Sequence, residues 1–142
     1  MDTVPDRTDR LNPRGSGDLT KTVVYEIALN VPENTPASNP VSTKNNNDYP
    51  TLSLPAGQID GFVITVPSGA NGAVFFKIKV NDHTVFPSNS NQNGFSNLTN
   101  VVARFIPTNV CIDTNNTALD LEAYNLSSSF NYLILVDVVM EV

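Results

Sequence analysis

The chain has one cysteine, one histidine, no tryptophan and no long apolar run. A single cysteine excludes an internal disulfide and a multi-cysteine zinc site. Without about 18 consecutive apolar residues a transmembrane helix is not expected, and the first seven residues lack the apolar stretch that is typical of a signal peptide. Charged residues make up only 15% of the chain and the net charge is −6, which disfavours a general nucleic-acid binder. We therefore expect neither a nucleic-acid nor a membrane partner.

Uncharged polar residues take the place of the missing charge. Asn, Ser and Thr together supply 43 of the 142 residues, and 17 residues are Val. This composition predicts an amide- and hydroxyl-rich surface over a valine-rich core. A chain of this length is expected to form one domain and can bury a core without metals or disulfides.

Residues 1–21 differ from the rest of the chain. They contain Pro and Gly, few large apolar residues, and half of the eight basic residues, balanced by four Asp. Such a segment does not fold alone. It is either a disordered tail or an arm that orders on a neighbouring subunit, which it could reach over about 60 Å when extended. In the second case its partner-binding candidates are the basic residues Arg7, Arg10, Arg14 and Lys21.

From residue 22 onward the pattern indicates strands. Apolar residues alternate in the first segment, and no segment keeps a helical period, apart from a possible helical turn at Phe95–Asn100. This predicts an all-β domain over residues 22–142: an antiparallel, jelly-roll-like β-sandwich of about eight strands preceded by an extended arm. The strand order stays open. The expected strands are 22–31, a short one near Val41, 52–54, 59–66, 73–80, 83–86 after a two-residue turn at Asn81-Asp82, 101–106, 110–112, 118–126 and 132–142.

The aromatic residues divide by position. Tyr25, Phe62, Phe76 and Phe105 fall within expected strands, which predicts that they fill the core. A second group lies in or beside loops and supplies the candidates for an exposed contact, although these side chains could also cap the edge of the core. These residues are Tyr49, Phe95 and Phe130.

Few residues suggest chemistry. His83 adjoins the expected tight turn and is interpreted as a solvated polar residue, and Cys111 in an apolar strand is interpreted as a buried, inert thiol. Oxygen ligands at Asp113, Asn115 and Asp120 could hold calcium, but a polar turn explains them better, with Asp120 and its neighbour Glu122 facing solvent. No nucleophile–base pattern is present, so we expect a protein that is not an enzyme and has no cofactor.

Short turn and strand motifs are spread over most of residues 22–142. They are Asn34-Thr35-Pro36-Ala37-Ser38-Asn39-Pro40, Gly57-Gln58-Ile59, Pro67-Ser68-Gly69-Ala70-Asn71-Gly72, Phe86-Pro87-Ser88-Asn89 and Ala123-Tyr124-Asn125. Together they resemble a group of small β-sandwich proteins among the structural genes of tailed phages and related prokaryotic viruses. The last hairpin departs from that group, which often carries aromatic and histidine residues there, because this chain has Ser127-Ser128-Ser129-Phe130-Asn131-Tyr132.

The resemblance implies a non-enzymatic virion component that assembles in the host cytoplasm: a capsid decoration or cement protein, a capsid-vertex protein or a head-fibre subunit. It implies contacts with other copies, as a trimer or pentamer, and with the major capsid protein or another virion protein. The arm and the free sheet edges would make these contacts. The alternative is a carbohydrate- or host-surface-binding sandwich module, which predicts exposed Tyr49, Phe95 or Phe130 beside clustered Asn, or calcium at residues 113–120.

Overall fold

The computed structural model describes residues 21–70, 72–87, 95–97 and 103–142. The arm residues Arg7, Arg10 and Arg14 and most of residues 88–102 lie outside these ranges. The described residues include the single-turn 3-10 helices η2 (Thr43–Asn45) and η3 (Ser68–Ala70). The strands within the described ranges are β1 (Thr22–Val31), β2 (Val41–Ser42), β3 (Leu52–Leu54), β4 (Gly57–Thr65), β5 (Val74–Val80), β6 (His83–Phe86), β7 (Arg104–Ile112), β8 (Thr117–Asn125) and β9 (Tyr132–Glu141).

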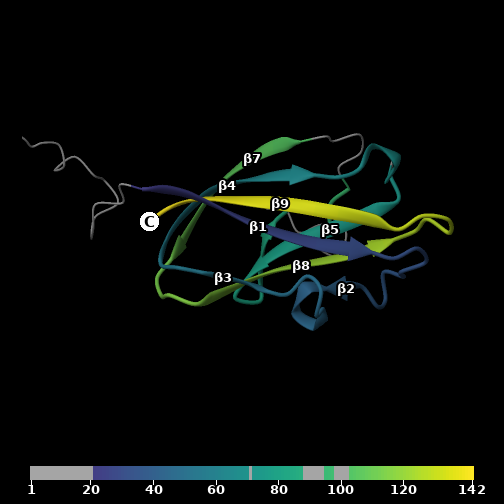
Figure 1. Cartoon of the computed structure of the whole chain (residues 1–142), viewed down its shortest axis with the longest axis horizontal. Coiled ribbons are helices and arrows are strands. Elements are labelled where there is room, and N and C mark those ends of the chain that lie inside the picture. Colours follow the sequence, from purple (N-terminus) through teal and green to yellow (C-terminus); the bar gives the residue numbers. More distant parts are fainter. Residues whose placement is uncertain (1–20, 71, 88–94, 98–102) are drawn as a thin grey trace, which may run out of the picture.

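The strands form two antiparallel sheets packed face to face, so the prediction of an all-β sandwich is confirmed (Figure 1). The β9 sheet has the order β1-β9-β4-β7. The β8 sheet has the order β2-β8-β5-β6, and β3 pairs with β8 beyond the end of β2. If β2 and β3 are counted as one interrupted strand, these are the two strand orders of an eight-stranded jelly roll. The sequence alone had left this order open.

The core lies between the two sheets and follows the period-two alternation of the strands. In β1 the buried residues are Ile27, Leu29 and Val31, and in β5 every second residue from Val74 to Val80 is buried, as predicted. Phe62 and Phe76 are fully buried. Each such side chain contributes about 1.5–3 kcal/mol relative to an exposed one, so this inner layer accounts for the stability of the sandwich.

The predicted turn between β5 and β6 is also confirmed. Asn81 and Asp82 both have positive φ, 52° and 66°, which are the values of a type I′ turn. Asn and Asp tolerate this conformation better than other residues with a Cβ atom. The expected helical turn after residue 95 is wrong in its described part, because Ser96 forms a β-bridge with Phe76.

Two predictions about β7 are wrong. The segment is one continuous strand through Pro107 rather than two short ones, because β7 is an edge strand and only one of its sides needs backbone partners. Arg104 at its start is exposed, and from Ile106 onward the even-numbered residues face the sandwich interior. The odd-numbered residues therefore face outward, which leaves Phe105 51% exposed and Cys111 exposed, where both had been expected in the core.

Asp120 was expected on the solvent face of its strand, but it is only 5% exposed. Between β2 and β3 the chain leaves the edge of β8 and crosses over this carboxylate. Asp120 Oδ1 accepts hydrogen bonds from the Thr43 hydroxyl, at 2.9 Å, and from the Thr51 hydroxyl. The alternation of β8 set the direction of the side chain correctly. The burial arises from the segment packed outside the sheet.

Candidate functional site

The sandwich has two different ends along its long axis (Figure 1). At one end Lys21, the last residue of the arm, pairs with Val142 through two backbone hydrogen bonds, 3.4 and 2.9 Å long, and so lies beside the C-terminus. At the other end lie the β1–β2, β4–β5 and β8–β9 loops. We call this the loop end.

A buried amide organises the loop end. Asn125, the last residue of β8, is fully buried. Its Nδ2 donates to the carbonyl oxygens of Val31, at 3.1 Å, and Phe130, at 2.9 Å, and its Oδ1 accepts from the backbone N–H of Ser127, at 2.9 Å. One side chain therefore satisfies three backbone groups and sets the path of the β8–β9 loop.

Both neighbouring loops hold the same β8–β9 loop. From the β1–β2 loop, the Asn34 N–H donates to the Ser127 carbonyl oxygen at 2.8 Å. From the β4–β5 side, the Ala73 carbonyl oxygen accepts from the Leu126 N–H at 2.9 Å. The β8–β9 loop is consequently fixed on two sides.

The fixed loop presents apolar side chains beside a shallow hollow. Leu126 and Phe130 are 61% and 62% exposed. The hollow has a volume of about 470 Å³, and its other walls are small residues of the β4–β5 loop, the hydroxyls of Ser127–Ser129, and Tyr132. The Tyr132 hydroxyl donates to the Gly69 carbonyl oxygen at 2.7 Å, which ties the two walls together. None of the residues lining the hollow is charged.

The outer face of the β9 sheet carries a second candidate surface. In register, Val24 of β1 lies opposite Val139 of β9, which lies opposite Gly61 of β4. The ring of Phe105, from β7, lies against Gly61, where a Cβ atom would collide with it. These four residues form an apolar band across all four strands. Val24, at 59% exposure, and Phe105 are its most exposed members.

Acidic residues border the apolar band. Glu26 of β1 lies directly opposite Asp137 of β9, so the adjoining row carries two like charges side by side. Acidic Glu141 and uncharged Gln58 lie opposite each other on the other side of the band. Apart from Arg104, which is exposed at the start of β7, the outward-facing strand residues of this sheet in the described part of the chain include acids and no Lys or Arg.

The three predicted contact aromatics have different surroundings. Phe130 is exposed at the loop end, whereas Tyr49 is half-buried. Phe95 is only 9% exposed, so it caps the edge of the core instead of forming an exposed contact. Its ring meets Tyr124 edge-on at 5.0 Å, and the Lys77 ammonium lies 4.5 Å from its centroid.

The outer face of the β8 sheet is closed by its own contacts. Tyr124 also stacks on Phe75 at 4.9 Å, and Lys77 forms a 3.1 Å ion pair with Glu122. Burial raises the pKa of Tyr124 above its ordinary value. These groups already partner one another, so this face offers less to a ligand than the loop end does.

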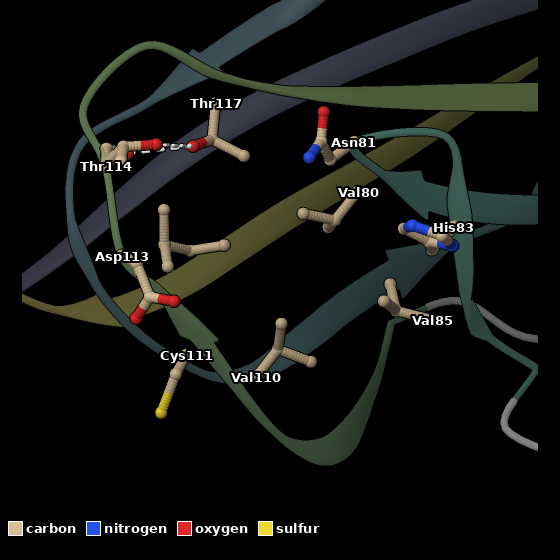
Figure 2. A pocket seen from close by; sticks show the side chains of 10 residues that line it. Val80, Asn81, His83, Val85, Val110, Cys111, Asp113, Thr114 and Thr117 are labelled. Atoms are coloured by element: carbon tan, nitrogen blue, oxygen red, sulfur yellow. Dashed lines mark hydrogen bonds between the residues drawn. The ribbon is translucent and has the colours of Figure 1, made fainter.

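A pocket of about 410 Å³ lies between β6 and β7 (Figure 2). Its floor is apolar, with Val80, Val85 and Val110, and His83 and Cys111 are on its lining. Figure 2 shows these two residues on opposite sides of the pocket, with the thiol pointing away from the imidazole. The pocket therefore does not bring the Cys111 thiol together with the His83 imidazole.

The three residues predicted as calcium ligands, Asp113, Asn115 and Asp120, do not share a common set of contacts. The Asn115 side-chain oxygen accepts from the backbone N–H of Ala56 at 2.8 Å, and the Asp120 carboxylate binds two threonine hydroxyls. Asp113 is exposed in the β7–β8 turn. Across the described ranges, no three His, Cys, Asp or Glu side chains gather closely enough to hold a metal ion.

The sequence interpretation did not single out Asn125, Leu126 or Val24 as site residues. One usable signal was available for Asn125, which falls on the apolar face of the alternating segment 118–126. A buried amide must find hydrogen-bond partners, and backbone groups of adjoining loops are the nearest ones. The exposure of Leu126 and Val24 depends on neighbouring segments that no local pattern specifies.

No protein-family model, curated protein or solved structure matches this chain. In the described part of the chain, no helix has the length and apolar character needed to span a membrane.

Proposed function

We propose that this protein is a non-enzymatic structural subunit of a virion, of the capsid decoration, cement or vertex type. In this proposal it docks on the particle through its N-terminal arm, its sheet edges and the outer face of the β9 sheet. The resemblance of residues 22–142 to phage structural proteins motivates the proposal. The observation that carries it is the apolar band Val24–Val139–Gly61–Phe105, which crosses the sheet that the arm leads into.

The charge distribution favours a particular kind of contact. The outer face of the β9 sheet is acidic around its apolar band, so two such faces would repel each other through the Glu26–Asp137 row. A cationic partner segment would complement it. The whole arm is neutral, but its stretch 7–14 holds Arg7, Arg10 and Arg14 against a single Asp and supplies such a segment from a neighbouring copy. Lys21, the last residue of the arm, lies at the edge of this sheet.

The sheet edges provide a second mode of association. β1 and β7 form the two edges of the β9 sheet. An edge strand carries backbone groups that a strand of another subunit can pair with. β7 carries Pro107 in its middle, which limits continuous pairing there. β1 has no proline and is therefore the better edge for pairing.

The test is the solution mass of the full chain and of residues 22–142, measured by light scattering after size exclusion. We expect a trimer or pentamer for the full chain and a smaller or weaker assembly after truncation. A V24S/F105S variant of the full chain should dissociate in the same way, whereas L126S at the loop end should not. A full chain that stays monomeric at millimolar concentration would contradict self-association.

A further inference from the structure

We propose that the loop end is a binding site for a neutral saccharide, with the ring of Phe130 as its stacking surface. This activity goes beyond the structural role proposed above. It is carried by three properties of the hollow beside Phe130: its chemistry, its rigidity and its position on the molecule.

The chemistry of the hollow suits a sugar. Its volume of about 470 Å³ lies within the range of small-ligand sites, roughly 300–1,000 Å³. Its lining combines backbone and small side chains with serine hydroxyls, an exposed phenyl ring and the phenol of Tyr132. Hydroxyls both donate and accept hydrogen bonds, as a sugar requires, and an aromatic face can cover the apolar C–H face of a pyranose ring. Because no lining residue is charged, the ligand that fits is neutral.

The Ser127 hydroxyl is available to donate a hydrogen bond to such a ligand. Ser127 Oγ accepts from the backbone N–H groups of Ser129 and Phe130, both at 3.2 Å. An oxygen that accepts two backbone bonds still has its own hydrogen to donate. Ser128 and Ser129 are exposed beside it. The loop therefore offers several polar groups within reach of one ring.

Rigidity reduces the cost of binding. A mobile loop would lose conformational freedom on binding a ligand, which weakens affinity. Here Asn125 bonds the Phe130 carbonyl oxygen directly, and the β1–β2 and β4–β5 loops bond the same segment from both sides. The Phe130 backbone is thus already ordered before a ligand arrives, although its ring is one of the most exposed large apolar groups of the described chain.

An apolar peptide is the competing occupant, and the lining favours it less. A hydrophobic anchor needs a deep apolar pocket, whereas the walls here are mainly glycine, alanine and serine, and the hollow is shallow. The loop end also lies opposite the end that holds the C-terminus (Figure 1), beside which Lys21 lies. A subunit docked through its arm would therefore point this site away from the particle. This orientation rests on the proposed function, whereas the existence of the site does not depend on it.

The experiment applies the full-length protein to an array of glycans ending in neutral galactose, mannose, glucose or N-acetylglucosamine, with sialylated and sulfated glycans as comparators. We expect binding to a neutral glycan, with amide NMR shifts at residues 126–132 when that glycan is titrated. F130A should weaken the affinity about tenfold or more, and F130Y, which keeps the ring, should retain it. H83A is the control, because it removes an exposed ring that lies outside both the hollow and the apolar band.

Three outcomes would overturn the saccharide site. One is no binding to any neutral glycan, another is binding that F130A leaves unchanged, and the third is binding to anionic glycans only. Selection of apolar peptides in place of glycans, with shifts at the same residues, would replace the saccharide by a protein partner. The light-scattering result does not depend on Phe130, so the two proposals can fail separately.

Discussion

The side-chain amide of Asn125 donates a 2.9 Å hydrogen bond to the backbone carbonyl oxygen of Phe130, so a fully buried residue holds the backbone of a highly exposed one. The same amide also bonds Val31 at the end of β1. The position of the exposed ring is therefore linked to the core of the sandwich. An exposed aromatic on a loop held this firmly is available for contact at little cost in conformational entropy.

Replacing Asn125 by Ala should destabilise the whole domain. The substitution leaves the carbonyl oxygens of Val31 and Phe130 and the N–H of Ser127 without this partner, and a buried unsatisfied group costs about 1–3 kcal/mol. We expect a loss of about 2–4 kcal/mol in urea unfolding. N109A, at an exposed position of β7, is the control, and its free energy of unfolding should stay within about 0.5 kcal/mol of that of the unsubstituted chain. Equal effects of the two substitutions would show that the network contributes nothing.

Replacing Asp120 by Ala should release the segment between β2 and β3. The carboxylate accepts bonds from the Thr43 and Thr51 hydroxyls, and bonds to a charged group contribute about 1.5–3 kcal/mol. We expect lower stability by about that amount and faster amide exchange in residues 43–51. D113A removes an exposed carboxylate and serves as the control. Unchanged exchange in D120A would mean that packing alone holds the segment.

Replacing Gly61 by Ala should be destabilising through two separate collisions. The added Cβ would meet the ring of Phe105 and would lie 2.8 Å from the Ile106 carbonyl oxygen. Overpacking of this kind costs about 1–3 kcal/mol. Because F105A removes only the first collision, G61A should lower the stability less in the F105A background than in the unsubstituted chain. A double-mutant cycle measured by urea unfolding checks this, and strict additivity would contradict the proposed contact.

Lys44 and Asp82 form an exposed ion pair whose Nζ–Oδ1 distance is 2.9 Å, and this pair should shift the pKa of both groups measurably. The hydrogen bond and charge of Lys44 hold the pKa of Asp82 below 3.8, and the bond to Asp82 raises the pKa of Lys44 above 10.5. The contribution of the pair is therefore lost as the pH falls through the lowered pKa of Asp82, or rises through the raised pKa of Lys44.

In K44M, an NMR titration should show the pKa of Asp82 moving up toward 3.8. Lys79 lowers the pKa of Asp82 more weakly, so K79M should give a smaller rise. The stability of K44M at neutral pH should change little, because exposed pairs contribute little. An unchanged pKa of Asp82 in K44M would show that the pair does not persist in solution.

Local alternation was sufficient to predict much of the sandwich. It identified the inward residues of β1, β5 and β8, and the Asn81-Asp82 turn followed from residues that tolerate positive φ. It was insufficient for Phe105 and Cys111, because an apolar residue in a strand has the same local signature whether it faces the core or the outside of an edge strand. The burial of Asp120 could not be predicted for another reason, because the segment that covers it lies more than 60 residues away in the sequence.

The sequence by itself determined the fold class and the positions of most strands, because alternation, turn residues and composition are local properties. The tertiary structure alone decided the jelly-roll strand order, the apolar band that joins Val24 to Phe105, and the hollow beside Phe130. Each of these depends on which distant strands and loops become neighbours. That choice is made by the burial of the two inner sheet faces together, which no single segment encodes.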